Sequence, residues 1–453
     1  MKQTARLALI CLGLLHGAAG AAAQPAIYSA EALQQDFQVL QNAISVTHPD
    51  PDIYVSAEKL KNTYALIAAQ LKEPLTRDQA LRVLAQVNPA FSDAHLLVSQ
   101  PDWAEQAKEH LNNGGVLFPF DLQIAGNGEM RIRAELDGRA SRLAGTRVEQ
   151  VNGVPAAEII RQLLPLVAGD SPELRAHLLS RRAWFYYWKV FGAPKRFDLV
   201  LSQPRARLLS VAGTPTLPLA VAERDARQSG AKLFSFERLG QDAALLTIKQ
   251  FMSPDKPAFY AFTRDMFEKL RDERIRTLII DIRENTGGDD DLWKTGILPY
   301  IADKPYRHAS SYVKKVIPGR GSETERVGDV VNGFVSLTPP DLDNPLHFSG
   351  KTYVITGRIT YSSAVLFSNV VQDFGFAKLV SAGGYANVRQ SGGVQNIVLP
   401  NTGLELSVPR FVLDRPSGER QPALMRPDIV LPDSPFDPRA IVDALLLKIR
   451  LRK

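Results

Sequence analysis

A serine at the start of a helix is the first residue in this sequence whose position suggests chemistry. The β-forming residues of a buried parallel strand lie between Lys351 and Ile355, and Gly357 allows a sharp exit from that strand. From Ser363 the apolar residues recur at helical spacing. Ser362 therefore falls on the turn, where the unpaired N–H groups of the helix start favour a developing anion. An acyl-transfer enzyme requires its nucleophile in such a place.

A structural role for Ser362 stays open on this pattern alone, because serine is also a preferred helix N-cap. A second stretch supports the chemical interpretation. Residues 276–288 read as another buried strand that ends in a polar turn with two adjacent glycines, Gly287 and Gly288. Paired glycines can expose backbone N–H groups to a ligand.

Together these stretches resemble the tail-specific (C-terminal processing) protease family of serine peptidases, which includes the tricorn protease core and the interphotoreceptor retinoid-binding proteins. Asp281-Ile-Arg-Glu-Asn-Thr-Gly-Gly288 is similar to the family's Asp-Leu-Arg-x-Asn-x-Gly-Gly strand end. Thr360-Tyr-Ser-Ser-Ala, followed by Gln372-Asp373, is similar to its Thr-Ala-Ser-Ala segment. The resemblance implies that Ser362 is the nucleophile and that the oxyanion hole is formed by the N–H groups of Ser363 and of Gly287 or Gly288.

The segment Phe91-Ser-Asp-Ala-His95 resembles the Asp-Gly-His segment of the His-dependent members of this family, with Ala94 in place of the glycine. The resemblance implies that His95 is the general base. An imidazole suits this task because its ordinary pKa of about 6.5 lets it take and return a proton near neutral pH. The structural alternative is a packing histidine at a helix–strand junction.

The third catalytic residue is less well defined by the sequence. The processing proteases pair their serine with a lysine, but the matching position here is Asn387, so a Ser–Lys dyad is not expected. The tricorn-like branch uses a late glutamate shortly before a Pro-Asp pair. Pro427-Asp428 resembles that pair, the matching slot holds Gln421, and Glu419 two residues earlier is the candidate. Its alternative is a solvated loop carboxylate.

The elements that must position these residues indicate an α/β (α+β multidomain) protein. Helical stripes of apolar residues predict a helical N-terminal region at 24–105. Strand, helix and strand in succession predict an α/β catalytic domain with crossover strands at 241–453. Residues 203–240 carry prolines and little apolar periodicity, which predicts a linker.

Residues 114–202 are rich in β-forming residues, and Gly126-Asn127-Gly128 predicts a tight hairpin turn. The segment from Ser141 to Val154 resembles the strand and turn of a PDZ-like module, a fold that takes a peptide as an added strand. An ordinary β-rich inserted domain is the alternative. The aromatic cluster from Trp184 to Trp188 is expected to pack between domains, with a substrate contact as the other interpretation.

Composition and charge limit the partners. The chain has 453 residues and a formal net charge of +6, with no basic cluster interleaved with aromatics, so nucleic acid is not an expected partner. Residues 1–23 fit a secretory signal peptide ending in an Ala-x-Ala site, and no other apolar run approaches a membrane span. Cys11, the only cysteine, lies inside that signal; a lipoprotein acylation site there is the alternative. A periplasmic or secreted protein is expected.

The sequence thus predicts an exported serine peptidase that hydrolyses peptide bonds of a peptide or protein substrate through an acyl-enzyme on Ser362. No metal and no cofactor are expected, since Asp289-Asp290-Asp291 fits a solvated turn better than a cation site. Two alternatives stay open: a non-catalytic protein that binds a peptide or an apolar ligand on the same scaffold, and an esterase or amidase for non-peptide acyl groups.

Overall fold

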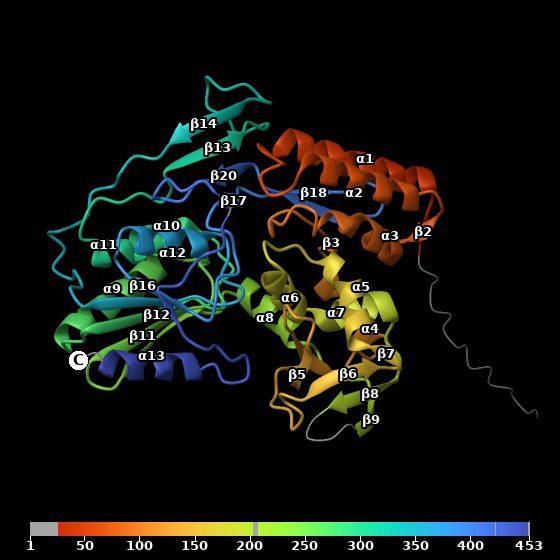
Figure 1. Cartoon of the computed structure of the whole chain (residues 1–453), viewed down its shortest axis with the longest axis horizontal. Coiled ribbons are helices and arrows are strands. Elements are labelled where there is room, and N and C mark those ends of the chain that lie inside the picture. Colours follow the sequence, from red (N-terminus) through yellow and green to blue (C-terminus); the bar gives the residue numbers. More distant parts are fainter. Residues whose placement is uncertain (1–25, 203–206, 422, 452–453) are drawn as a thin grey trace, which may run out of the picture.

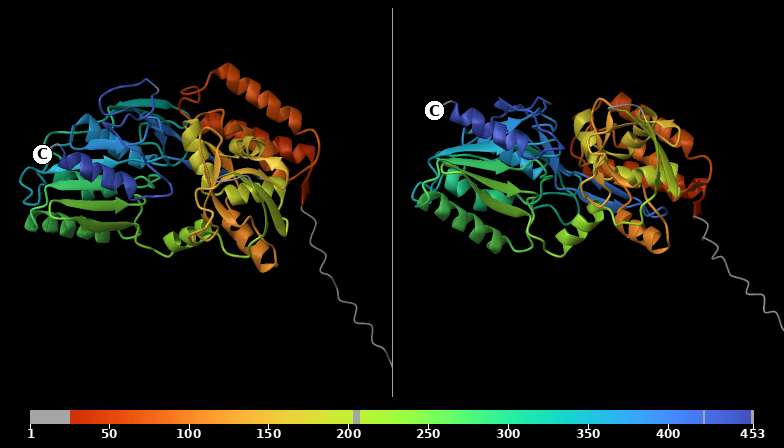
Figure 2. Two further views of the ribbon diagram at one scale, coloured as in Figure 1. Left: turned by 60° about the horizontal axis from the view of Figure 1, so that its bottom comes forward. Right: turned by 90° about the horizontal axis from the view of Figure 1, so that it is seen from below.

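The first half of the chain forms one lobe and most of the second half forms another (Figures 1 and 2). The computed structural model describes residues 26–202, 207–421 and 423–451, so the predicted signal peptide, residues 1–23, lies outside the described residues. Within these described residues, helices and five sheets alternate along the sequence, which confirms the predicted α/β class.

The first lobe begins with the predicted helices. Three of them start at side chains that cap their free N–H groups: Ser29, Ser56 and Thr76. Thr76 also forms a capping box with Gln79. The elements of this part are β1 (Ile27–Tyr28), α1 (Ala30–Thr47), α2 (Ala57–Gln70), β2 (Leu75–Thr76), α3 (Arg77–Leu84), η1 (Ala85–Val87), β3 (Leu97–Ser99) and α4 (Trp103–Asn112).

An antiparallel sheet completes the first lobe. Its path runs β4-β5-β6-β8-β9, and β7 also pairs with β6. The predicted hairpin is confirmed, because β4 and β5 pair across the turn at 125–129. The bounds are β4 (Phe120–Ile124), β5 (Met130–Glu135), β6 (Arg147–Val151), β7 (Val154–Pro155), α5 (Ala156–Leu163), η2 (Leu164–Leu166), α6 (Pro172–Ser180), α7 (Ala183–Phe191), β8 (Arg196–Ser202) and β9 (Arg207–Ala212).

The aromatic cluster lies on α7, where Trp184, Phe185, Tyr186 and Tyr187 are all buried. These rings pack into the core of the first lobe, so their role is packing, as expected, but inside a lobe and not between two domains.

A six-stranded sheet forms the centre of the second lobe, in the order β10-β11-β12-β15-β16-β21. β10 is antiparallel to β11, and the other pairings are parallel. α9 connects β11 to β12, and α12 connects β15 to β16, as the crossover prediction requires. The bounds are β10 (Phe234–Leu239), β11 (Ala243–Ile248), α9 (Lys256–Asp272), β12 (Thr277–Asp281), β15 (Lys351–Ile355), α12 (Ser363–Asp373), β16 (Lys378–Ser381), β21 (Ile429–Val430) and α13 (Ala440–Arg450).

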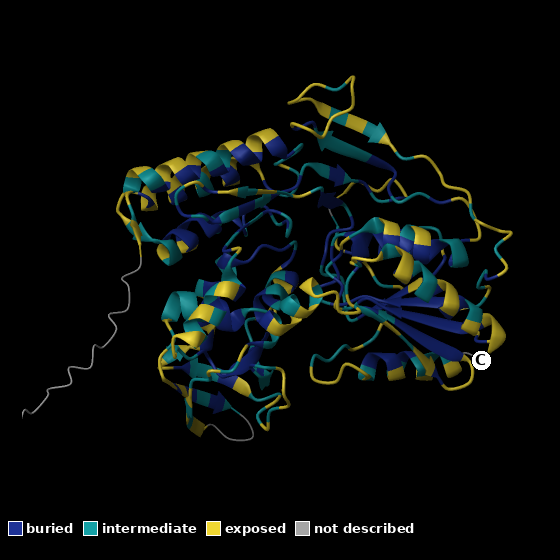
Figure 3. Cartoon of the chain, turned by 180° about the vertical axis from the view of Figure 1, so that it is seen from behind, coloured by how far each residue is buried: buried dark blue, intermediate teal, exposed yellow. Residues whose placement is uncertain are grey.

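Helices cover both faces of this sheet. Leu246 and Ile280 pack into the core that contains α9 and α12, whereas their neighbours Leu245 and Ile279 pack into the core that contains α13. Successive strand residues point to opposite faces, so a strand covered on both sides is apolar throughout. Figure 3 shows the resulting buried strands between helices that are exposed on one side only.

The predicted linker at 203–240 is wrong in one respect, because it contains β9, α8 (Leu219–Gln228) and β10. The residues of β9 are exposed or half-buried, and α8 buries Val221 alone. Elements that bury so little leave no apolar periodicity in the sequence.

The second half of the chain also returns to the first lobe. β18 (Gln395–Val398) and β19 (Glu405–Val408) form a sheet with β3, and the turn between them donates hydrogen bonds to Asp36 from Asn401 and Thr402. The blue β18 lies beside the red helices in Figure 1. Residues of the predicted catalytic domain are thus part of the first lobe's core.

A four-stranded sheet in the order β14-β13-β20-β17 completes the second lobe. The remaining elements are α10 (Asp290–Gly296), α11 (Leu298–Ile301), β13 (Ser311–Lys315), β14 (Val330–Phe334), β17 (Gln390–Gly392) and β20 (Phe411–Leu413). Within the described parts of the chain, no helix combines the length and apolar character needed to cross a bilayer.

Candidate active site

Ser362 stands at the start of α12 and faces His95 from the other lobe. Its Oγ lies 2.9 Å from His95 Nε2. Its side chain does not cap the helix, so the capping alternative is wrong. The backbone of Ser362 has φ 52° and ψ −127°, a conformation that costs a non-glycine residue on the order of 1–3 kcal/mol. The surrounding structure therefore holds this hydroxyl toward His95 at an energetic cost.

Hydrogen bonds between neighbouring strand ends hold the turn before Ser362. Thr360 Oγ1 accepts the N–H of Gly357 at 2.8 Å and donates to the carbonyl of Ile282 at 2.8 Å. The N–H of Tyr361 donates to the carbonyl of Asn285 at 3.1 Å. Because β12 and β15 are adjacent and parallel, their two turns meet at one edge of the sheet.

The glycine pair lies directly against Ser362. Gly287 has φ 102°, and a Cβ on it would lie 2.6 Å from Cβ of Ser362, so a side chain there would displace the serine. The N–H of Gly287 donates to Asn285 Oδ1 at 2.8 Å and is not free for a substrate. Within the described residues, the N–H groups of Gly288 and Ser363 have no acceptor. Of the two predicted glycines, Gly288 is therefore the one with a free donor.

Ser363 has a second function in the fold. Its hydroxyl donates to Asp290 at 2.6 Å and accepts the indole N–H of Trp293 at 2.9 Å. These bonds fix the first turn of α12 against α10, and with it the direction of the Ser363 N–H.

His95 is held by groups that the sequence did not single out. Its Nδ1 lies 2.9 Å from Ser391 Oγ and 3.6 Å from Asp93 Oδ1. Its backbone N–H donates to Asp93 Oδ1 at 2.8 Å, and its ring packs against Tyr361 with ring centres 4.7 Å apart. Neutral imidazole with a proton on Nδ1 leaves Nε2 free to accept the Ser362 proton.

Asp93 is the nearest negative charge to this imidazole, and its side chain is 3% exposed. Burial alone would raise the pKa of Asp93, but the hydrogen bonds and the charge of His95 outweigh burial and lower the pKa to about 2. Asp93 is therefore a carboxylate at neutral pH, placed to stabilise a protonated His95.

The prediction for Glu419 does not agree with the structure. Its side chain is 47% exposed, and its partner is Arg415, at 3.6 Å. Arg415 in turn binds Asp373, the last residue of α12. An 11-residue helix is ~16 Å long, so Glu419 lies near the opposite end of α12 from Ser362. Its solvated-loop alternative describes it better.

The aspartates after the glycine pair form ion pairs within the protein. Lys256 Nζ lies 2.5 Å from Asp289 and 2.9 Å from Asp291. In the part of the chain that the structure describes, no group of three or more His, Cys, Asp or Glu side chains is arranged to hold a metal ion.

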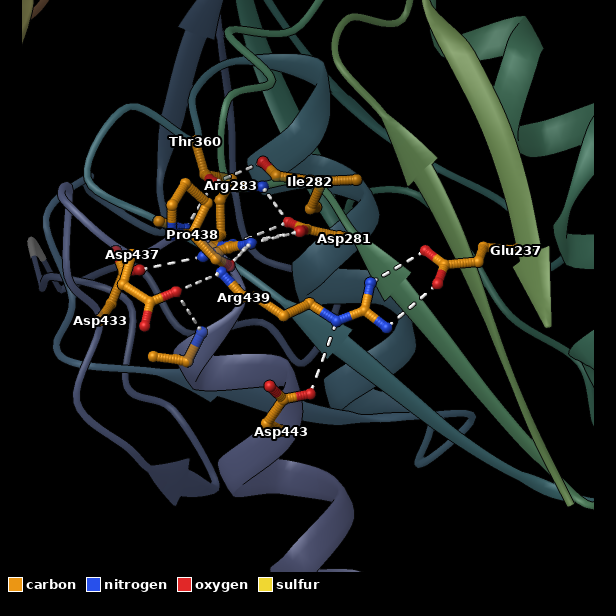
Figure 4. Close-up of polar contacts among 12 residues, drawn as sticks. Glu237, Asp281, Ile282, Arg283, Thr360, Asp433, Asp437, Pro438, Arg439 and Asp443 are labelled. Atoms are coloured by element: carbon orange, nitrogen blue, oxygen red, sulfur yellow. Dashed lines mark hydrogen bonds and ion pairs between the residues drawn. The ribbon is translucent and has the colours of Figure 1, made fainter. Parts of the chain in front are cut away.

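A charged cleft of about 610 Å³ lies beside the site, at the carboxyl ends of β11 and β12 and between the lobes. Its walls carry ion pairs, and neither Ser362 nor His95 lines it. Arg283 binds Asp281 at 2.7 Å and Asp433 at 3.0 Å, and Asp433 also binds Arg358 at 3.0 Å. Figure 4 shows the contacts of Arg283 with Asp281 and Asp433, together with the pairing of Arg439 to Glu237 and Asp443. The ion pairs in the walls of this cleft thus hold the C-terminal segment against the ends of the strands.

The family of the second lobe follows from a comparison with known proteins. Residues 242–431 match the model of peptidase family S41, and this match contains the turns of Gly287–Gly288 and of Ser362. This part of the chain belongs to peptidase family S41. The predicted family and the predicted serine-type peptidase are confirmed. A search of curated proteins gives no match to the sequence.

Solved structures extend the likeness to both lobes. Mature CPAF is 15% identical and aligns over 92% of this chain and 96% of its own, with a TM-score of 0.60. Mature CPAF complexed with lactacystin is 15% identical over 93% and 98%, with a TM-score of 0.59. A CPAF mutant is 15% identical over 92% and 96%, with a TM-score of 0.62. At this identity the likeness shows a shared fold, in which the S41 domain is joined to the first lobe.

Proposed function

We propose that the protein hydrolyses peptide bonds by nucleophilic catalysis, with Ser362 as the nucleophile and His95 as the general base. The observation that carries the proposal is the 2.9 Å contact between Ser362 Oγ and His95 Nε2 across the two lobes, with Ser362 inside the residues that match peptidase family S41. Peptides or proteins are the substrates that the family implies.

The reaction follows the hydrogen bonds of the site. His95 Nε2 takes the proton as Ser362 Oγ attacks the substrate carbonyl, and the N–H groups of Gly288 and Ser363 receive the negative charge on the carbonyl oxygen. The imidazolium returns the proton to the leaving amine, which leaves an acyl-enzyme on Ser362. Water, activated by the same imidazole, then releases the acid and restores the serine.

Asp93 and Ser391 take the place that the sequence gave to Glu419. Ser391 Oγ accepts a hydrogen bond from the Nδ1–H group of His95 and fixes the direction of the ring. Asp93, ionised at neutral pH, compensates the positive charge that His95 carries after proton transfer.

Labelling with a fluorophosphonate probe tests this function directly. We expect the purified protein to gain one probe mass, located on Ser362 by peptide mapping, with no labelling of Ser362→Ala and at least tenfold slower labelling of His95→Ala. Ser253→Ala, which removes a half-buried serine outside the proposed site, is the matched control and should label as the wild type does. Folded wild-type protein that takes up no probe would point instead to a binding protein.

We further propose that the protein is exported to the periplasm or secreted, on the signal-peptide pattern of residues 1–23. Mass spectrometry of the mature protein should place its first residue near Gln24. Residues 114–202 stay a PDZ-like prediction, and binding of substrate carboxyl-terminal peptides to the first lobe would test it.

A further inference from the structure

A second carboxylate, Asp170, reaches the active site from the loop between η2 and α6. Its Oδ1 accepts the N–H of Ala94 at 3.1 Å and the hydroxyl of Tyr361 at 2.7 Å, and its Oδ2 accepts the N–H of Asn387 at 2.8 Å. These three residues belong to the segments that carry His95, Ser362 and Ser391. One side chain therefore holds all three segments of the proposed site together.

The hydroxyl of Tyr361 is shared between two carboxylates. It lies 2.7 Å from Asp170 Oδ1 and 3.1 Å from Asp93 Oδ1, and its oxygen accepts the N–H of Ala94 at 3.0 Å. A phenol has one hydrogen to donate, so it can serve only one of the two carboxylates at a time. Asp93 Oδ2 is buried and has no hydrogen-bond partner among the described residues.

One additional proton satisfies this arrangement. If Asp170 carries it on Oδ1, Asp170 donates to the Tyr361 oxygen, and Tyr361 donates to Asp93. The Tyr361 oxygen then accepts two hydrogen bonds, from Ala94 and Asp170, and Asp170 Oδ2 still accepts the N–H of Asn387. Without this proton, two negative charges face each other across one hydroxyl, and Asp93 loses a donor.

We propose that Asp170 is a positioning residue for the Ser362–His95 pair, which holds a proton so that Tyr361 can donate to Asp93 and keep Asp93 beside His95. This inference rests on the proposed function. Burial and the charge of Asp93 raise the pKa of Asp170 to about 7, so the proton leaves to solvent as the pH rises above neutral. The segment from Asp93 to His95 then loses the hydrogen bond from Tyr361, and the negative charge of ionised Asp170 repels that of Asp93.

Several other titratable groups surround this cluster. Burial raises the pKa of Tyr361 and Tyr54 and lowers the pKa of His48, so none of the three gains a charge near neutral pH. Arg389 faces Tyr54 but is paired with Asp414 at 2.7 Å. A wild-type pH profile reports every group of the site together, so variants are needed to identify the one responsible.

The pH dependence of kcat/KM in Asp170→Asn tests the proposal. We expect the wild-type kcat/KM to fall at least fivefold with a midpoint near pH 7, and Asp170→Asn, which mimics the neutral acid, to lack this fall and keep kcat within about tenfold at pH 6. Asp170→Ala should lower kcat about 100-fold or more at every pH with little change in KM, because it removes the acceptor of the Asn387 N–H and the side chain that joins the three segments. Glu173→Gln, an exposed carboxylate on α6, should retain the wild-type profile.

A wild-type profile that persists in Asp170→Asn, or an Asp170→Asn protein as inactive as Asp170→Ala, would overturn the proposal. An infrared titration of Ser362→Ala separates this result from a failure of the peptidase assignment, because it needs no turnover. The band of a protonated aspartic acid should disappear with a midpoint near pH 7 and be missing in Ser362→Ala/Asp170→Asn. If that band is missing from Ser362→Ala itself, Asp170 holds no proton and the inference is wrong.

Discussion

Two polar clusters lie at the carboxyl ends of neighbouring strands and differ in how completely their groups are paired. In the cleft, Arg283 has two carboxylate partners and Asp433 has two arginine partners. Burial alone would lower the pKa of Arg283, but these ion pairs raise it. Beside Ser362, by contrast, the backbone is strained, the Gly288 N–H has no acceptor among the described residues, and Asp93 Oδ2 has no partner there either.

This difference indicates a structural role for the cleft and a chemical role for the groups beside Ser362. Charged groups that are fully paired have no free donor or acceptor for a substrate, and removal of one partner lowers the stability of the fold. The ion pairs of the cleft therefore have a structural role, which is to hold the C-terminal segment against the sheet. Unsatisfied donors and acceptors can receive an oxyanion or a proton, and strain is retained where it serves a function. The same type of substitution should therefore affect stability in the cleft and turnover in the site.

The largest expected effect is that of Asp93→Asn. We expect kcat/KM to fall on the order of 10³-fold, because an amide does not compensate the charge of a protonated His95. The protein should still fold, since the amide oxygen can accept the hydrogen bonds of Asp93 Oδ1, but it should lose the stability that the lowered pKa of Asp93 contributes at neutral pH. Asp433→Asn in the cleft is the matched control, and it should lower stability while kcat/KM stays within about threefold. If Asp93→Asn keeps wild-type activity, Asp93 has no role in the reaction.

Gly287→Ala should reduce kcat about 100-fold or more. Its Cβ would lie 2.6 Å from Cβ of Ser362 and 3.0 Å from the N–H nitrogen of Ser363, so it moves the nucleophile away from the oxyanion donors. Steady-state kinetics on folded protein measures this effect. Gly319→Ala, which also has a positive φ but open space around it, controls for backbone strain and should retain activity.

Arg283→Ala tests the cleft. We expect a loss of about 3 kcal/mol in the free energy of unfolding, measured by urea denaturation, because Asp281 and Asp433 are left buried with fewer partners. The activity of the folded fraction should stay close to that of the wild type. A large loss of kcat without a loss of stability would show that the cleft takes part in the reaction.

The pH dependence of the free energy of unfolding should reveal the proton held by Asp170. The raised pKa of Asp170 means that the folded protein binds a proton that the unfolded chain releases above about pH 4. Its contribution is complete below pH 4 and is lost as the pH rises toward 7, on the order of 1 kcal/mol per pH unit. Asp93, whose pKa is lowered, has the opposite effect below about pH 4. Denaturation of Asp170→Asn between about pH 4 and 7 should lack this loss.

The smallest effect is expected for Glu419→Gln. An exposed carboxylate beside Arg415 should change the free energy of unfolding by no more than about 0.5 kcal/mol and leave kcat/KM unchanged. A decrease of more than tenfold in kcat/KM would restore Glu419 as a member of the site.

Local sequence predicted much of the fold and half of the site. The strand, turn and helix around Ser362 were predictable because a two-sided buried strand and an amphipathic helix each leave a clear apolar pattern. Asp93 lies inside the quoted segment, two residues before His95, but an aspartate in a turn is ordinarily a turn former. The positive φ of Ser92 marks that turn only in the structure.

The rest depends on contacts between distant segments. Tyr361 and Ser391 contact His95 from separate segments, Asp170 binds Tyr361 from a third, and none of them belongs to a periodic pattern that points to the others. The return of β18 and β19 to the first lobe is fixed by Asp36, which binds residues more than 360 positions away. Glu419 was selected by its spacing to a Pro-Asp pair, and spacing along the chain does not determine where a loop lies.

The central claim is that Ser362 and His95 act as one unit, and a double-mutant cycle on kcat/KM tests it most directly. If they do, the kcat/KM of Ser362→Ala/His95→Ala should equal that of Ser362→Ala to within about threefold, because His95 has no nucleophile to activate once Ser362 is absent. Two losses that multiply, or a His95→Ala protein close to the wild type in activity, would contradict the account.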